Sequence, residues 1–218
     1  MNFSSRIMRQ YSRKILEGSL TVFGLLLFAL FIHRQGILLI LAISGLLISA
    51  ITIHLSSRRT SLLRVSGITT FNKLLPLYLL IALILGVGLG ILARRAFHLT
   101  PFPENLTRIA IIAPLIGITE ELIFRGFIQG HIRSAGRIFS ILFAASGHTL
   151  YKLIVIMSLH DALAFNFQFL VFWTFIVGIL LGILREASGS VIPPALGHAC
   201  FDIILYGGFI MAPTWVWG

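Results

Sequence analysis

Long apolar runs, separated by short polar stretches, dominate the pattern of this chain. About 20 consecutive apolar residues can cross the hydrocarbon core of a bilayer as an α-helix, and seven runs approach or reach this length. They lie at about 19–32, 36–55, 74–93, 109–130, 138–158, 167–184 and 190–211. The pattern therefore predicts an all-α fold, a polytopic transmembrane helical bundle of about seven spans.

The composition agrees with a membrane protein. Hydrophobic residues make up 57% of the 218 residues and charged residues only 11%, with a mean hydropathy of +0.99, whereas about a quarter of a soluble domain is charged. The formal charge of +10 comes from short basic clusters between the apolar runs. We therefore expect the lipid bilayer as a partner and no nucleic acid. The single cysteine, Cys200, excludes an internal disulfide and a cysteine-based metal cluster.

The distribution of basic residues outside the spans predicts the orientation. If the amino terminus is cytoplasmic, eleven of them face the cytoplasm: Arg6, Arg9, Arg13, Lys14, Arg58, Arg59, Arg64, Lys73, Arg133, Arg137 and Arg185. Only four then face outside: Arg34, Arg94, Arg95 and Arg108. The positive-inside rule favours this orientation. Because no small-x-small cleavage site follows the first run, we expect that run to be a retained anchor and not a signal peptide.

The fourth run contains Glu120, Glu121 and Arg125. A charge at the bilayer centre costs about 2.5 to 3.5 kcal/mol on insertion scales, so such residues usually mark a functional site that faces protein or water. On an α-helix Glu121 and Arg125 are about 40° apart and are expected to pair. Glu120 lies about 140° from Arg125, which predicts an unpaired carboxylate. A buried ion pair that only fixes helix packing is the alternative reading for Glu121 and Arg125.

Three further polar residues lie in other runs at the same depth. Glu120, His148 and His198 are each about ten residues from the predicted cytoplasmic end of their spans, roughly 15 Å at 1.5 Å per residue. His198 and Asp202 are four residues apart, so Asp202 can orient the imidazole or share its ligand. Lys152, one turn from His148, is expected to snorkel or to line the cavity.

These residues predict a hydrolytic site. A carboxylate and a histidine can activate water, and a second histidine can stabilise an oxyanion. Alternatively, Glu120, His148 and His198 can bind zinc. Ser146 and Cys200 each lie two residues from a histidine and on a different helix face, so a nucleophilic mechanism is not expected. A single membrane histidine is more often a packing residue, but the matched depth favours a site.

Three motifs carry a resemblance to a known family. They are Glu120-Glu121-x-x-x-Arg125, then His148 in a span rich in Phe, Ala and Ser, and then Gly178-Ile-Leu-Leu-Gly182 ahead of Gly189-Ser-Val-Ile-Pro-Pro-Ala-Leu-Gly-His198-x-x-x-Asp202. In this order and spacing they resemble the CPBP family of intramembrane proteases, which includes type II CAAX prenyl endopeptidases and bacterial relatives linked to bacteriocin maturation or immunity and to sorting-signal processing.

The resemblance implies an all-helical protease of a prokaryotic cytoplasmic membrane that acts on a membrane-associated peptide or protein. In it, Glu120 with His148 would activate water, and His198 with Asp202 would stabilise the oxyanion. No cofactor is expected, although zinc is possible because the family's older label is metalloprotease. The chain would divide into membrane helices of about three spans at 1–104 and a CPBP-like catalytic core of about four spans at 105–218.

Two positions depart from the family pattern. Ala144 stands where Phe is usual, four residues before His148, and Asp202 stands where Asn is common. Asp202 can donate a hydrogen bond to an oxyanion only when protonated; otherwise it can accept one from His198.

Two other classes of function fit parts of the pattern. One is a non-catalytic membrane protein of the bacteriocin-immunity type. The presence of Glu120, His148 and His198 together argues against this class. The other is a proton-coupled transporter, because Glu, His and Asp at mid-membrane also suit proton movement. No pair of broken helices in matching halves supports a transporter.

Overall fold

The structure, a computed structural model, describes residues 3–70, 72–159 and 167–210, and every regular element in these ranges is helical. The α-helices are α1 (Phe3–Phe31), α2 (Ile37–Ser57), α3 (Leu62–Ser66), α4 (Leu75–Ala96), α5 (Arg108–Glu121), α6 (Gly130–Ile132), α7 (Arg137–Met157), α8 (Phe167–Ser188) and α9 (Ile192–Tyr206). A π-helix, η1 (Leu122–Gln129), joins α5 to α6, and a 3₁₀ turn, η2 (Arg133–Ala135), follows α6. The predicted all-α membrane fold is confirmed.

The number of spans differs in detail from the prediction of about seven. Among the described residues, five helices are long and apolar enough to cross a membrane, namely α1, α2, α4, α7 and α8. The fourth predicted span is the continuous run of α5, η1 and α6, which carries Glu120, Glu121 and Arg125. The seventh is α9, which has only 15 residues. Both segments carry candidate site residues, and the charges of the first lower its hydropathy.

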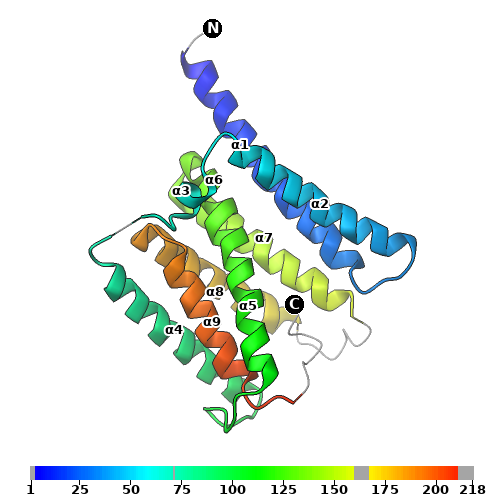
Figure 1. Ribbon diagram of the computed structural model, residues 1–218, viewed down its shortest axis with the longest axis vertical. Helices are drawn as coiled ribbons and strands as arrows, with labels where there is room; N and C mark the ends of the chain where they lie inside the picture. Colours follow the sequence, from blue (N-terminus) through cyan, green and yellow to red (C-terminus); the bar gives the residue numbers. More distant parts are fainter. Residues whose placement is uncertain (1–2, 71, 160–166, 211–218) are drawn as a thin grey trace.

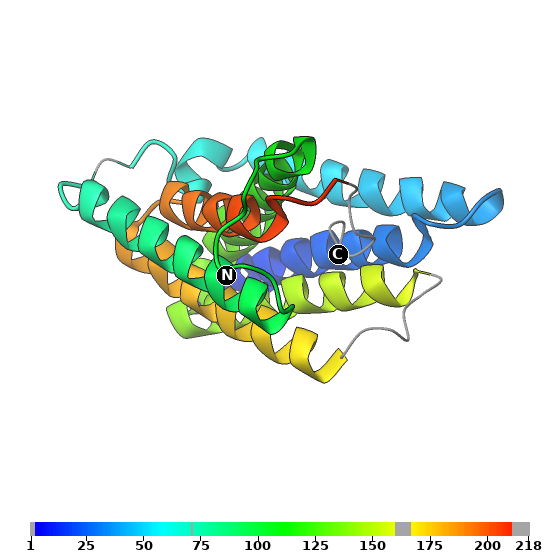
Figure 2. The same cartoon turned by 90° about the horizontal axis from the view of Figure 1, so that it is seen from below.

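The helices form two connected groups around α7 (Figure 1). In one group α1 and α2 make an antiparallel hairpin, and α1 also packs on α7. In the other group α9 lies between α4 and α5, and α8 packs on α7 (Figures 1 and 2). Of the segments that match the family motifs, α5 packs on α9, and η1, which continues α5, packs on α7.

Glycines allow α4 to approach α9 closely. A Cβ atom at Gly86 would overlap the backbone carbonyl of Gly197, and one at Gly90 would lie 2.7 Å from Cβ of Ile204. Small residues at such positions let membrane helices pack backbone to backbone. Gly88, between the two, would meet nothing within 4 Å, because it lies on another face of the helix.

The carboxyl end of α9 is anchored by Arg94 of α4. Nη1 of Arg94 donates to the carbonyl oxygens of Leu205 at 3.2 Å and Gly207 at 2.8 Å. The last carbonyls of a helix have no partner within the helix, so a buried cation there satisfies them and complements the helix dipole. This anchor holds the end of α9, the helix that carries His198 and Asp202, against α4.

Candidate active site

Three helical segments bring the six predicted site residues into one buried cluster. Each of these side chains is at most 12% exposed. They are Glu120 and Glu121 at the end of α5, Arg125 on η1, His148 on α7, and His198 and Asp202 on α9. The matched depth predicted from the sequence therefore corresponds to contact in space, while the chemical role of each residue stays a prediction.

The expected pair of Glu121 and Arg125 is present. Nη1 of Arg125 lies 2.8 Å from Oε1 of Glu121, and the two side chains are 1% and 0% exposed. Arg125 lies on the π-helix η1, a rare geometry that occurs often at functional sites. Its backbone carbonyl accepts a hydrogen bond from Nε of Arg185 at 3.3 Å. The cation is therefore held by its partner carboxylate and by the packing of η1.

The same guanidinium fixes the tautomer of His148. Nη1 of Arg125 lies 3.0 Å from Nδ1 of His148, and because a guanidinium can only donate, Nδ1 must accept. The proton of a neutral imidazole then lies on Nε2, which is 3.3 Å from Oε2 of Glu120. The ring of Phe124 covers the imidazole with a centroid distance of 4.7 Å. His148 is therefore oriented as a donor to Glu120.

The prediction that Glu120 is unpaired is wrong. Nζ of Lys152 lies 2.7 Å from Oε1 of Glu120. Lys152 is four residues after His148 on α7, so both side chains project from one face of the helix towards the same carboxylate. The helical angle between Glu120 and Arg125 excludes only a partner on the same helix, whereas Lys152 lies on another helix. The signal that could have found this contact is the spacing of four between a histidine and a lysine in an apolar run.

His198 has a different close partner from the one expected. Its Nδ1 lies 3.0 Å from Oε1 of Glu121 and donates to that carboxylate. Its Nε2 lies 3.9 Å from Oε2 of Glu120 and 3.9 Å from Oδ1 of Asp202. Glu121, and not Asp202, therefore orients the imidazole. Asp202 and Glu120 are at the same distance from Nε2 of His198.

Close approach of α5 and α9 at this point requires a glycine. A Cβ atom at Gly117 would lie 2.9 Å from Cδ2 of His198 and would overlap Oδ2 of Asp202. Gly117 is one turn before Glu120 and Glu121 on α5. The absence of a side chain at Gly117 thus lets α9 place its polar residues beside the two glutamates.

The buried cluster needs one additional proton to be electrically neutral. Three carboxyl groups face two basic side chains, which gives a net charge of −1 when both histidines are neutral and the other groups are ionised. A net charge is unfavourable in a buried, low-dielectric layer. His148 cannot take the balancing proton, because Nδ1–H would then oppose the N–H of Arg125. Because Glu121 and Glu120 each contact a basic side chain, His198 and Asp202 are the groups left to hold the proton.

The donor set does not fit the zinc ion that the resemblance leaves possible. A histidine binds a metal through an unprotonated nitrogen, but Nδ1 of His148 accepts from Arg125 and Nε2 then carries the proton. The ammonium of Lys152 also occupies one oxygen of Glu120. Within residues 3–70, 72–159 and 167–210, no group of three or more His, Cys, Asp or Glu is arranged to hold a metal ion.

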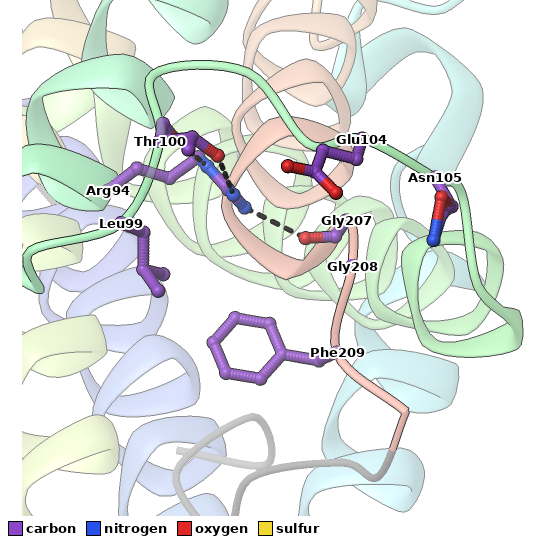
Figure 3. A pocket seen from close by; sticks show the side chains of 8 residues that line it. All are labelled: Arg94, Leu99, Thr100, Glu104, Asn105, Gly207, Gly208 and Phe209. Atoms are coloured by element: carbon purple, nitrogen blue, oxygen red, sulfur yellow. Dashed lines mark hydrogen bonds between the residues drawn. The ribbon is translucent and has the colours of Figure 1, made fainter.

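A separate cavity of about 210 Å³ lies where α4 and α9 end (Figure 3). Arg94 borders it, but its guanidinium is turned to the carbonyl of Gly207 and to Thr100. Gly207 is nine residues beyond His198, which corresponds to about 13 Å along a helix axis. The cavity is therefore distinct from the candidate active site.

Comparison with protein families agrees with the motifs. Residues 102–204 match the family described as type II CAAX prenyl endopeptidase Rce1-like. The match begins before α5 and ends within α9, so it includes every member of the buried cluster. Comparison with individual curated proteins and with solved structures gives no match.

Together, the apolar helices and the family define the class: an integral membrane protease. Within that class, the family matched by residues 102–204 is the Rce1-like type II CAAX prenyl endopeptidases, which confirms the resemblance to the CPBP proteases over this part of the chain.

Proposed function

We propose that this protein is an intramembrane endopeptidase that hydrolyses a peptide bond of a membrane-associated protein or peptide with a water activated by Glu120. One observation carries the proposal: Nε2 of His148 and Nε2 of His198 lie 3.3 and 3.9 Å from the same oxygen, Oε2 of Glu120. A general base must reach its proton directly or through one water. A water beside Oε2 would meet the base and both imidazoles.

In the proposed reaction, Glu120 takes a proton from the water while the water oxygen attacks the carbonyl carbon of the substrate. The electron pair of the C=O double bond moves to the oxygen, and a proton on Nε2 of His198 stabilises the resulting oxyanion by a hydrogen bond. The C–N bond then breaks, and Glu120 passes its proton to the departing amine. The products are a new carboxyl terminus and a new amino terminus.

The remaining residues of the cluster would position these groups. His148 holds Oε2 of Glu120 through Nε2–H, and Arg125 fixes the tautomer that makes this possible. Glu121 orients His198. Asp202, 3.9 Å from Nε2 of His198, would favour a proton on that nitrogen. No step uses a metal, because His148 presents a proton where a metal ligand needs a lone pair.

The distribution of basic residues supports a particular orientation of the protein in the membrane. Eleven basic residues against four support a cytoplasmic amino terminus, and the family's bacterial relatives support a prokaryotic cytoplasmic membrane. In this orientation the cluster lies near mid-membrane, so the substrate must enter the bilayer or lie against it. Nucleic acid has no part in the proposal.

The other functions carry less support from the geometry. A proton-coupled transporter would use the same residue types, but it gives no reason for two imidazoles to share one carboxylate oxygen. A non-catalytic protein of the bacteriocin-immunity type gives no reason for the buried cluster of charges, each held in a defined orientation.

The proposal is tested by identifying protein termini in membranes that contain the wild-type protein or Glu120→Gln. We expect new pairs of termini within membrane-associated proteins with the wild type and none with the variant. Glu104→Gln is the matched control, because it makes the same chemical change at an exposed glutamate outside the cluster. Identical sets of termini for the wild type and Glu120→Gln would refute the proposal.

A further inference from the structure

Two donors from one face of α7 hold the two oxygens of Glu120 separately. Lys152 approaches Oε1 with its Nζ at 2.7 Å, and His148 approaches Oε2 with its Nε2 at 3.3 Å. The spacing of four residues places the donors one above the other on the helix. The carboxylate therefore has one oxygen in contact with the amine of Lys152 and one oxygen that faces the two histidines.

Lys152 contacts Glu120 although its side chain lies near enough to the end of α7 to extend to the membrane surface. It lies five residues before Met157, the last residue of α7, which corresponds to about 7.5 Å along the axis. Lysines near the ends of membrane helices commonly extend to the interface, where the ammonium is hydrated. The side chain of Lys152 is instead turned inward and is 12% exposed. Its orientation thus indicates a role in the cluster.

We infer that Lys152 is a positioning residue for the proposed reaction: it keeps Glu120 ionised within the membrane and holds Oε1, so that Oε2 is the oxygen that receives the proton of the water. This inference rests on the proposed function for its consequence in catalysis. The charge state of Glu120, however, is a property of the resting protein and can be measured without a substrate.

The charged and titratable groups that face Glu120 come from three segments. They are Lys152, His148 and Tyr151 of α7, His198, Asp202 and Tyr206 of α9, and Glu121 with Arg125 of α5 and η1. Arg125 is committed to Glu121, so Lys152 is the cation nearest to Glu120. If the positive charge of Lys152 is removed, the cluster has one more negative charge that no cation balances. Protonation of Glu120 neutralises this charge directly.

The first experiment measures the protonation state of Glu120 by infrared spectroscopy of purified protein at neutral pH. An ionised and a protonated carboxyl group absorb at different frequencies. We expect no protonated-acid band that depends on Glu120 in the wild type. Lys152→Met should gain such a band, and Lys152→Met with Glu120→Gln should lose it. Lys152→Arg, which keeps the charge, and Lys73→Met, an exposed lysine far from the cluster, should show none.

The outcomes that overturn the inference are equally direct. A protonated-acid band in the wild type that Glu120→Gln removes would show that Lys152 does not keep Glu120 ionised, and this result needs no Lys152 variant. A Lys152→Met protein without a new band would contradict the inference, as would a new band that survives Glu120→Gln. If Lys152→Met does not fold, Lys152→Gln is measured in its place.

The second experiment separates the inference from the proposed function. Ionised Glu120 is the active base, so activity falls on the acid side where Glu120 becomes protonated. Loss of Lys152 favours the neutral acid, and the acid limb of the pH–activity profile should move about 1 to 3 pH units upward. Lys152→Arg should restore most of that shift. A wild-type protein without cleavage but with the infrared pattern above would refute the proposed function alone; a cleaving enzyme with an unmoved limb would refute the inference alone.

Discussion

The guanidinium of Arg125 lies 3.0 Å from Nδ1 of His148, and this contact determines which imidazole nitrogen carries the proton. The same Nη1 lies 2.8 Å from Glu121, so one side chain links the carboxylate beside His198 to the imidazole beside Glu120. Arg125 is therefore more than the structural partner of Glu121. Its removal should affect both stability and the hydrogen bonding of the site.

Glu121→Gln should lower the stability of the protein. The change leaves Arg125 charged and unpaired in a buried layer, which typically costs about 3 to 5 kcal/mol. Glu121→Gln combined with Arg125→Met should recover part of the loss in a thermal melt in detergent. It should not restore cleavage, because His148 then lacks the donor that fixes its tautomer. Full recovery of activity in the double variant would contradict the role given to Arg125.

Glu120→Gln should abolish turnover at a smaller cost in stability than Glu121→Gln. An amide occupies the same volume as the carboxylate but cannot accept the proton of water. The change leaves Lys152 without its ion pair, but the side chain is 12% exposed and close to the end of α7, whereas Arg125 is 1% exposed. Thermal melts and peptide cleavage of both variants test this order. An equal loss of stability in the two would contradict it.

Gly117→Ala should impair the site although it replaces none of the charged or titratable residues. The added Cβ would lie 2.9 Å from the ring of His198 and would push α9 away from α5. A displacement of about 1 Å at a reacting group can cost about 100-fold in rate. Gly88→Ala is the matched control, because a Cβ there meets nothing within 4 Å. We expect the control to keep its activity and to gain up to about 1 kcal/mol in stability.

Zinc should not be required for activity. The tautomer of His148 leaves no lone pair on Nε2 for a metal, so we expect substoichiometric zinc in purified protein and full activity after treatment with a chelator. Elemental analysis and cleavage assays test this directly. Near-stoichiometric zinc, with activity lost to the chelator and restored by zinc, would contradict the metal-free mechanism.

The sequence predicted the helices well because the length of an apolar run is a local property. The run at 138–158 became α7 at Arg137–Met157, and the run at 74–93 became α4 at Leu75–Ala96. The common depth of Glu120, His148 and His198 could also be predicted, since every α-helix rises by the same 1.5 Å per residue. These arguments were sufficient to place Glu120, His148 and His198 in the same layer, where the structure has them close together.

The contacts between helices could not be predicted in the same way. Which residues of two helices face each other depends on the rotation of each helix about its axis, and residue spacing within one helix does not define it. The contacts of Glu120 with Lys152 and of Glu121 with His198 are both of this kind. The π-helix that begins at Leu122 adds a further change of rotation directly after the two glutamates. No pattern of apolar and polar residues predicts this π-helix.

The most direct test of the central claim is hydrolysis by the purified protein in water enriched in oxygen-18. The wild type and Glu120→Gln are incubated in detergent with a set of membrane-spanning peptides, and the products are analysed by mass spectrometry. If Glu120 activates water that attacks the carbonyl carbon, each new carboxyl terminus from the wild type carries one oxygen-18 atom, and Glu120→Gln yields none of these products. Labelled products formed by Glu120→Gln at a rate near that of the wild type would contradict the account.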